Sequence, residues 1–291
     1  MLTHPNFDPV AISIGPLQVH WYGIMYMFAF TAAWLIASRE AKRPHAVIES
    51  KHVEDLIVYG ALGVILGGRI GYIVFYKFSA WMADPLMILR IWEGGMSFHG
   101  GFLGVILAIY LYSRKIKVPF FGTLDFLAVI TPLGLGFGRI GNFIGQELWG
   151  RETDVSWGMV FPRDPDMLVR HPSQLYQAFL EGLVLFCIIY WFTRKPRPRL
   201  AATSLAILTY GSFRFFVEFF REPDSHLQEL TFGWLTRGQM LSIPMILGGL
   251  TLLIWAYRNH TPSAELKTAT VTEAKTQTDK QKKTKKRKKK K

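Results

Sequence analysis

Seven long apolar stretches constrain the fold of this 291-residue chain more than any other feature. A helix that crosses a hydrocarbon layer needs about 20 mainly apolar residues. Only 19% of the residues are charged. The sequence therefore predicts an all-α polytopic membrane protein with seven transmembrane helices. Their approximate bounds are 20–38, 55–76, 96–113, 120–144, 173–193, 200–220 and 238–257.

The segment between the second and third stretches, Phe78–Trp92, is too short and too polar to span. We expect it to lie along the membrane interface.

Basic residues fall mainly on one side of the predicted bundle. The loops after the first, third and fifth stretches and the C-terminal segment carry 24 Lys and Arg residues, against 7 in the other loops. Because Lys and Arg are retained on the cytoplasmic side, the N-terminus is expected outside and the C-terminus in the cytoplasm. The absence of a basic residue before Arg39 also argues against a cleaved signal peptide.

The net charge of +13 is concentrated near the C-terminus. Residues 258–291 carry 13 basic and 3 acidic residues, which leaves only +3 on residues 1–257. We interpret 1–257 as a membrane domain and 258–291 as a disordered, lysine-rich cytoplasmic tail. The tail either remains solvated and reinforces the orientation or contacts anionic lipid head groups. The membrane domain is not expected to bind nucleic acid.

Three arginines lie inside predicted spans, where inserting an arginine into the membrane costs about 2.5–3.5 kcal/mol of free energy. Arg69 is surrounded by glycines, and a structural role is favoured for it. Arg139 and Arg214 have two interpretations, either structural ion pairs or ligands of a phosphate group. The second rests on guanidinium, which binds phosphate oxygens bidentately.

One histidine opens the third stretch. His99 stands in Gly94-Gly95-Met96-Ser97-Phe98-His99-Gly100-Gly101, where glycines allow another backbone or a ligand to approach. Two interpretations stay open. His99 is either a packed hydrogen-bonding residue or a group that transfers a proton or contacts a ligand.

Polar residues gather at the outer end of the fourth stretch. Gly138–Arg151 contains Arg139, Asn142 and Glu147 among many glycines, and Pro132 precedes it. A regular helix is not expected there. Irregular backbone at membrane depth must be buried in protein or line a cavity. This segment therefore predicts an outward-facing polar pocket.

The sixth stretch carries a polar stripe. Tyr210, Arg214 and Glu218 recur every four residues on an otherwise aromatic helix. The structural interpretation is an ion pair between Arg214 and Glu218. The functional interpretation is a stripe that faces the same cavity as Arg139.

The sequence lacks a P-loop, a paired Cys-x-x-Cys, a His-Glu-x-x-His and a Gly-x-Ser-x-Gly motif. The single cysteine, Cys187, is expected to be a packing residue, and no metal or cofactor is expected. The residues alone indicate an outward-facing site for an anionic, phosphate-bearing lipid or solute. The alternatives are an anion transporter, which predicts repeated halves that are not seen, and a lipid-binding protein without catalysis.

From about Phe7 to Arg258 the chain resembles bacterial prolipoprotein diacylglyceryl transferase. The resemblance implies a seven-span plasma-membrane enzyme whose site faces the periplasm. It implies transfer of the diacylglyceryl group of phosphatidylglycerol to the lipobox cysteine of a prolipoprotein, forming a thioether and releasing glycerol phosphate. The motifs that carry it are His20-Trp21-Tyr22-Gly23, the segment around His99, Gly138–Gly150, Arg170-His171-Pro172-Ser173-Gln174-Leu175-Tyr176 and Tyr210–Arg221.

The resemblance also implies which residues form the site. Positions that are essential in the family fall on His99, Arg139, Asn142, Gly150 and Arg214. Positions thought to support the site fall on Tyr22, Tyr76, Glu147, Tyr210 and Glu218.

In the implied mechanism, the arginines hold the phosphate, and His99 either removes the thiol proton or positions the lipid. The chain departs from the family pattern at Gly145, where a second Asn is usual, and at Gln177, where Glu is common. The loop between Arg151 and Arg170 is also short for the family.

Overall fold

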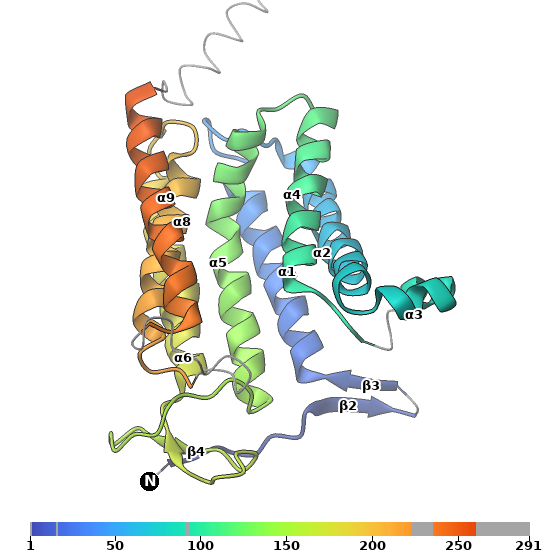
Figure 1. The fold of residues 1–291 in the computed structure, drawn as a ribbon. Helices are drawn as coiled ribbons and strands as arrows, with labels where there is room; N and C mark the ends of the chain where they lie inside the picture. Colours follow the sequence, from blue (N-terminus) through green and yellow to red (C-terminus); the bar gives the residue numbers. More distant parts are fainter. Residues whose placement is uncertain (1, 16, 91–93, 223–234, 260–291) are drawn as a thin grey trace, which may run out of the picture.

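The apolar stretches form upright helices that lie side by side (Figure 1). The computed structural model describes residues 2–15, 17–90, 94–222 and 235–259. Six long helices are α1 (Trp21–Glu40), α2 (Val53–Tyr76, preceded by the short η1, Ser50–His52), α4 (Phe98–Lys115), α5 (Phe120–Ile144), α8 (Ala201–Val217) and α9 (Arg237–Asn259). The remaining stretch is one continuous helical segment made of α6 (Ser173–Gln177), the π-helical η4 (Ala178–Val184) and α7 (Leu185–Phe192).

The described part of the chain is mostly helical and has the composition of a membrane protein. Five of its helical segments are long and apolar enough to cross a membrane. The other two predicted stretches are also helical, but α4 has 18 residues and α8 has 17. Helices therefore occur at all seven predicted positions, whereas the number of membrane crossings stays a prediction.

Two small sheets, which the all-α prediction omitted, lie below the helix ends in Figure 1. β4 (Met159–Val160) pairs in parallel with β1 (Leu2–Thr3) and antiparallel with β5 (Val169–Arg170). β2 (Val10–Ile14) and β3 (Leu17–His20) form an antiparallel hairpin. Strands of two to five residues are too short to give a clear alternating pattern in the sequence.

The prediction that a regular helix is absent from Gly138–Arg151 was wrong as far as Ile144, and only the residues from Gly145 to Arg151 are non-helical. α5 is a continuous helix from Phe120 to Ile144 with Pro132 inside it. A helix satisfies its own backbone hydrogen bonds in an apolar environment. The glycines instead allow close contact with neighbours, and a Cβ at Gly141 would lie 2.9 Å from the ring of Tyr22 on α1.

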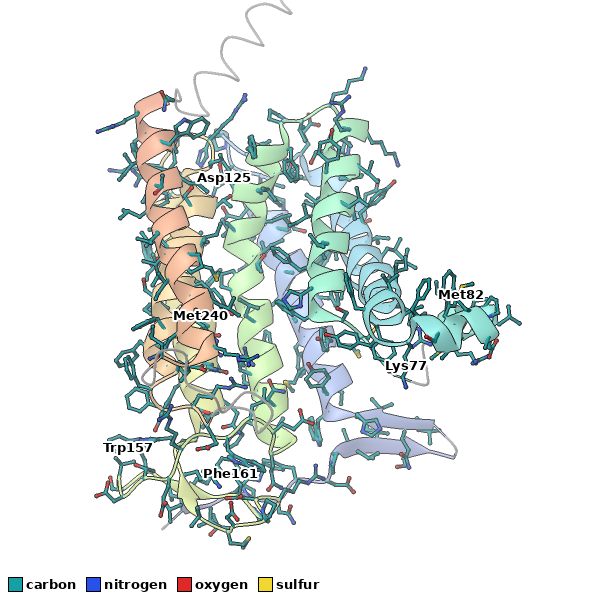
Figure 2. All side chains as sticks on the ribbon, viewed as in Figure 1. Lys77, Met82, Asp125, Trp157, Phe161 and Met240 are labelled. Atoms are coloured by element: carbon teal, nitrogen blue, oxygen red, sulfur yellow. The ribbon has the colours of Figure 1, made fainter. Side chains whose placement is uncertain are left out.

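A short arm leaves the bundle between α2 and α4. It consists of α3 (Phe78–Ala83) and η2 (Pro85–Leu89), and Lys77 and Met82 mark it in Figure 2. Phe78, Met82, Leu86 and Leu89 are exposed, which is typical of a segment that lies on a lipid surface. The last part of the predicted interfacial segment, residues 91–93, lies outside the described residues.

Arg69 attaches this arm to α2, which agrees with the structural role favoured for it. Its side chain is buried and donates to the backbone oxygens of Met87 (2.5 Å), Arg90 (2.9 Å) and Ile88 (3.3 Å). Its Nη1 also donates to the oxygen of Gly94. All of these acceptors belong to the connection between α2 and α4.

At the end of the bundle away from the strands, Asp125 joins α5 to α8 (Figure 2). Its carboxylate accepts from the backbone N–H of Leu200 (2.7 Å) and from the N–H and hydroxyl of Thr203 (2.8 Å each). These are unsatisfied donors at the start of α8, so Asp125 caps that helix from a neighbouring one. The contact orients α8 relative to α5, and both helices carry candidate site residues.

Candidate functional site

Charged side chains from α5, η4 and α8 meet near the helix ends on the strand side. Arg139 Nε lies 3.8 Å from Glu181 Oε2. Arg214 forms an ion pair with Glu218, and Arg221 Nη1 lies 3.9 Å from the other oxygen of Glu218. Glu181 also interacts electrostatically with Arg214 and Arg221. We refer to these five residues as the charged cluster.

A close crossing of two helices brings Arg139 to Glu181. A Cβ added to Gly182 would lie 2.7 Å from the Cα of Gly136, so only glycine allows this approach. Arg139 follows Gly136 by three residues, and Glu181 directly precedes Gly182. Glu181 also lies within the π-helical segment η4. Such segments are rare and are frequent at functional sites.

Sequence analysis missed Glu181. It is fully buried, and neither of its carboxylate oxygens has a hydrogen-bond partner within the described residues. The sequence carried a signal, because Glu181 is the only charged residue in the predicted span 173–193. An ionisable residue within a span is by itself a reason to suspect a functional site.

A second chain of contacts leads from Arg139 toward α1. Arg139 Nη1 donates to Asn142 Oδ1 at 3.5 Å, and Asn142 Nδ2 donates to Glu147 Oε2 at 3.3 Å. Tyr22, which packs on Gly141, interacts electrostatically with both Glu147 and Arg139. The structure therefore brings the predicted residues of α1 and α5 together.

The polar stripe of α8 faces the charged cluster. Tyr210 interacts electrostatically with Arg139, Arg214 and Glu181. Glu218 is buried and accepts a hydrogen bond from Thr236 Oγ1 at 3.1 Å. Both interpretations of the stripe therefore apply, because the Arg214–Glu218 ion pair exists and the stripe also lies beside Arg139.

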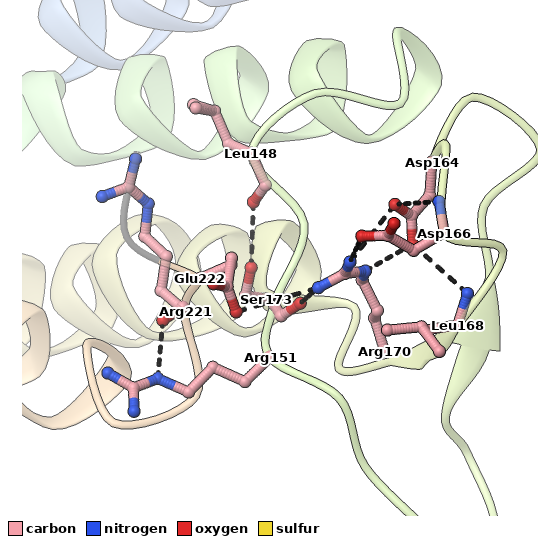
Figure 3. Close-up of polar contacts among 10 residues, drawn as sticks. Leu148, Arg151, Asp164, Asp166, Leu168, Arg170, Ser173, Arg221 and Glu222 are labelled. Carbon is pink, nitrogen blue, oxygen red and sulfur yellow. Dashed lines mark hydrogen bonds and ion pairs between the residues drawn. The ribbon is translucent and has the colours of Figure 1, made fainter. Parts of the chain in front are cut away.

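Gly150 lies in the loop between α5 and α6 (residues 145–172, the α5–α6 loop), which contacts the end of α8. Its N–H donates to the oxygen of His171 at 2.9 Å, and the next residue, Arg151, donates from its N–H to the oxygen of Phe220 at 2.9 Å. Arg151 Nε also donates to the oxygen of Arg221 at 3.0 Å (Figure 3). Thus the loop is tied to the backbone that directly follows Arg214 and Glu218.

A buried ion pair stabilises the same loop (Figure 3). Arg170 donates to Asp164 from Nε at 2.5 Å and from Nη2 at 3.2 Å, and it lies 3.7 Å from Glu222. Burial by itself would raise the pKa of Asp164, but Arg170 and the backbone N–H groups of Asp166 and Leu168 together outweigh it and hold this pKa below its ordinary value. Asp164 is therefore a carboxylate at neutral pH.

Two candidates make no hydrogen bond or ion pair with the charged cluster within the described residues. His99 is on the first turn of α4, is exposed, and has its ring 5.7 Å from that of Phe98. None of the described hydrogen bonds or ion pairs joins His99 to the cluster. Tyr76, at the end of α2, is 66% exposed and stacks on Tyr72 with 5.9 Å between ring centroids.

Helix packing accounts for the glycines that follow His99 on α4. A Cβ on Gly71 would lie 2.7 Å from the Cα of Gly100, and one on Gly67 would lie 2.7 Å from the Cα of Gly104. The backbones of α2 and α4 therefore contact each other directly at these glycines. The expected packing role of Cys187 was wrong, because this residue is exposed on the surface of α7, where a membrane protein meets lipid.

The charged cluster has the chemistry of an anion site. Guanidinium groups bind phosphate oxygens strongly in surroundings of low dielectric constant. Within the described residues, no group of three or more His, Cys, Asp or Glu side chains could hold a metal ion.

Comparisons with known proteins identify the family. Residues 9–255 match the family profile of prolipoprotein diacylglyceryl transferase. Three relatives carry the name phosphatidylglycerol–prolipoprotein diacylglyceryl transferase. That of Teredinibacter turnerae is 56% identical over 89% of this chain and 94% of its own length, and that of Acinetobacter baylyi is 56% identical over 89% and 95%. The protein of a Marinomonas species is 53% identical over 90% and 97%. The chain therefore belongs to the prolipoprotein diacylglyceryl transferase family.

Proposed function

We propose that this protein transfers the diacylglyceryl group of phosphatidylglycerol to the lipobox cysteine in the signal peptide of a prolipoprotein. The family profile and the names of the relatives support the reaction. The single structural observation that supports it best is the pair of arginines, Arg139 and Arg214, that two helices hold around one buried carboxylate. Charges such as these arginines are tolerated in an apolar helix bundle where they bind an anionic head group.

Arg139 is the residue best placed to bind the phosphate. Its contacts to Glu181 (3.8 Å) and Asn142 (3.5 Å) are longer than the usual 2.7–3.2 Å of an N–H···O hydrogen bond. Neither of these two contacts is therefore a short hydrogen bond, although Arg139 also interacts with the Tyr210 hydroxyl. Arg214, in contrast, is closely paired with Glu218. We assign Arg139 to direct phosphate binding and Arg214 to charge stabilisation beside it.

The chemistry is a displacement at carbon. The thiolate of the prolipoprotein attacks the phosphate-bearing carbon of the diacylglycerol unit, a carbon–sulfur bond forms, and the bond from that carbon to the phosphate oxygen breaks. The leaving oxygen takes the electron pair, so negative charge grows on the phosphate, where Arg139 and Arg214 stabilise it. His99 either accepts the thiol proton or positions the lipid. No cofactor takes part in this scheme.

The supporting residues have roles that follow from their contacts. Asn142 donates to the head group while Glu147 orients it, and Tyr22 covers this side. Tyr210 and Glu218 orient the arginines. Gly150 holds the α5–α6 loop against the end of α8, and Tyr76 lies where the lipid enters the site.

We further propose seven membrane crossings in the bacterial inner membrane, with the N-terminus and an outward-facing site in the periplasm. Support comes from the basic residues at the opposite ends of the helices. There Arg194 lies over Tyr190 (4.5 Å) and Arg197 over Phe192 (4.3 Å), an interfacial arrangement of cations and rings. Residues 1–257 form the catalytic membrane domain, with 258–291 as a cytoplasmic tail. Nucleic acid is not a partner.

The proposed function is tested with detergent-purified protein, phosphatidylglycerol and a lipobox peptide. Mass spectrometry should detect a diacylglyceryl adduct on the peptide cysteine. Arg139→Ala and Arg214→Ala should abolish the adduct, while Cys187→Ser serves as the matched control and thermal melts confirm folding. Bound but intact phosphatidylglycerol would instead support a lipid-binding protein without catalysis.

A further inference from the structure

Glu181 has no role in the mechanism above, although it lies at the centre of the charged cluster. Its side chain is 1% exposed, and Arg139, Arg214 and Arg221 all interact with it electrostatically. Its two oxygens make no hydrogen bond within the described residues. Its interaction with the arginines is therefore one of charge, without the hydrogen bonds of a structural ion pair.

The charged cluster carries a small excess of positive charge. Three arginines and two glutamates carry a net charge of +1. Glu147 is exposed and is hydrogen-bonded to Asn142, so solvent screens its charge. Without Glu181 the net charge of the cluster would be +2.

The reaction changes the charge of the bound phosphate. Phosphatidylglycerol is a phosphodiester with one negative charge. Glycerol phosphate is a monoester, whose second pKa near 6 gives it a charge of about −1.5 to −2 at neutral pH. Each added unit of positive charge in the site therefore strengthens binding of the product more than binding of the substrate.

We propose that Glu181 is a positioning residue that sets the charge of the phosphate site to match the monoanionic substrate and so permits release of the dianionic product. This inference rests on the proposed function. In this role Glu181 controls how strongly the site distinguishes a phosphodiester from a phosphomonoester. Glu181 acts through Arg139 and its neighbours and does not touch the reacting atoms.

The test is inhibition of the purified full-length enzyme by glycerol 1-phosphate at pH 7.5, measured against phosphatidylglycerol. Glu181→Gln keeps the shape and removes the charge, so its inhibition constant should fall on the order of 10-fold or more, as expected for a unit charge a few ångströms away. Its KM for phosphatidylglycerol should change less. Glu181→Asp keeps the charge and is the matched control, with an inhibition constant near that of wild type.

A charge reversion separates this role from a packing role. Arg221→Gln in the Glu181→Gln background returns the cluster to +1 and should restore the wild-type inhibition constant. If Glu181→Gln alone does not fold, the double variant is compared with Arg221→Gln, and the same 10-fold decrease is expected. Folded, active Glu181→Gln enzyme with an unchanged inhibition constant overturns the inference. Absence of transfer by the wild-type enzyme would instead contradict the proposed function.

Discussion

Replacement of Gly150 by alanine should show how the α5–α6 loop positions the site. A Cβ at Gly150 would lie 2.5 Å from the backbone oxygens of both His171 and Phe220, whereas ordinary contact begins at 3.4 Å. The backbones must therefore separate by about 0.9 Å, the difference between these two distances. Neither oxygen can rotate away, since both belong to hydrogen-bonded main chain.

The expected loss follows from this displacement. Phe220 lies two residues after Glu218 and six after Arg214, so the shift reaches the charged cluster. A misplacement of about 1 Å can cost on the order of 100-fold in rate, and overpacking costs about 1–3 kcal/mol of stability. We expect Gly150→Ala to lower kcat/KM for peptide modification on the order of 100-fold, with a reduced Tm.

Gly145→Ala is the matched control, because it lies in the same segment and has room for a methyl group. The atom nearest to a Cβ at Gly145 is 3.4 Å away, and the φ of this residue is −73°. Its kcat/KM should stay within about twofold of wild type, as is usual for a substitution that creates neither strain nor a cavity. Wild-type kcat/KM and Tm in Gly150→Ala would refute the reasoning.

Three further predictions concern the charged cluster, the exposed surface of α7 and the α5–α6 loop. Arg139→Lys keeps the charge but loses the bidentate geometry, and each lost charged hydrogen bond is worth about 1.5–3 kcal/mol. Transfer should fall on the order of 100-fold in the folded protein, and full activity would contradict the assignment. Cys187→Ser should leave turnover and Tm nearly unchanged, because this side chain is exposed and outside the cluster. Asp164→Asn should lower Tm at pH 7, because it weakens the buried pair with Arg170. The pKa of Asp164 lies below its ordinary 3.8, so its carboxylate stabilises the fold above that pH and loses this effect as the pH falls through the folded-state pKa. The difference in Tm between the variant and wild type should therefore shrink as the pH falls below 3.8, and parallel curves throughout that acid range would exclude this role.

Part of the site could be predicted because it is local in sequence. Arg214 and Glu218 are four residues apart on a helix, so their ion pair follows from helical geometry. Asn142 and Glu147 also lie close together along the chain, next to Arg139. The resemblance to the family also predicted that these residues belong to the site.

Other features depended on the packing of helices. Glu181 stood out in its span only as a lone charge, and its neighbour Arg139 is 42 residues away in the sequence. The glycines near Pro132 could equally have ended α5, and the position of Gly182 opposite Gly136 shows that one of them, Gly136, serves a helix crossing. Gly100 and Gly101 beside His99 likewise pack against α2, so a ligand is not needed to explain these two glycines.

The sequence by itself determined where the helices lie and that they form a membrane protein. Apolar length and the need to satisfy backbone hydrogen bonds within each segment are local properties. Only the tertiary structure decided which charges meet, because side chains on different helices come together through close backbone crossings. One such crossing, between Gly136 and Gly182, brings a buried carboxylate beside Arg139 and makes the charged cluster a single electrostatic unit.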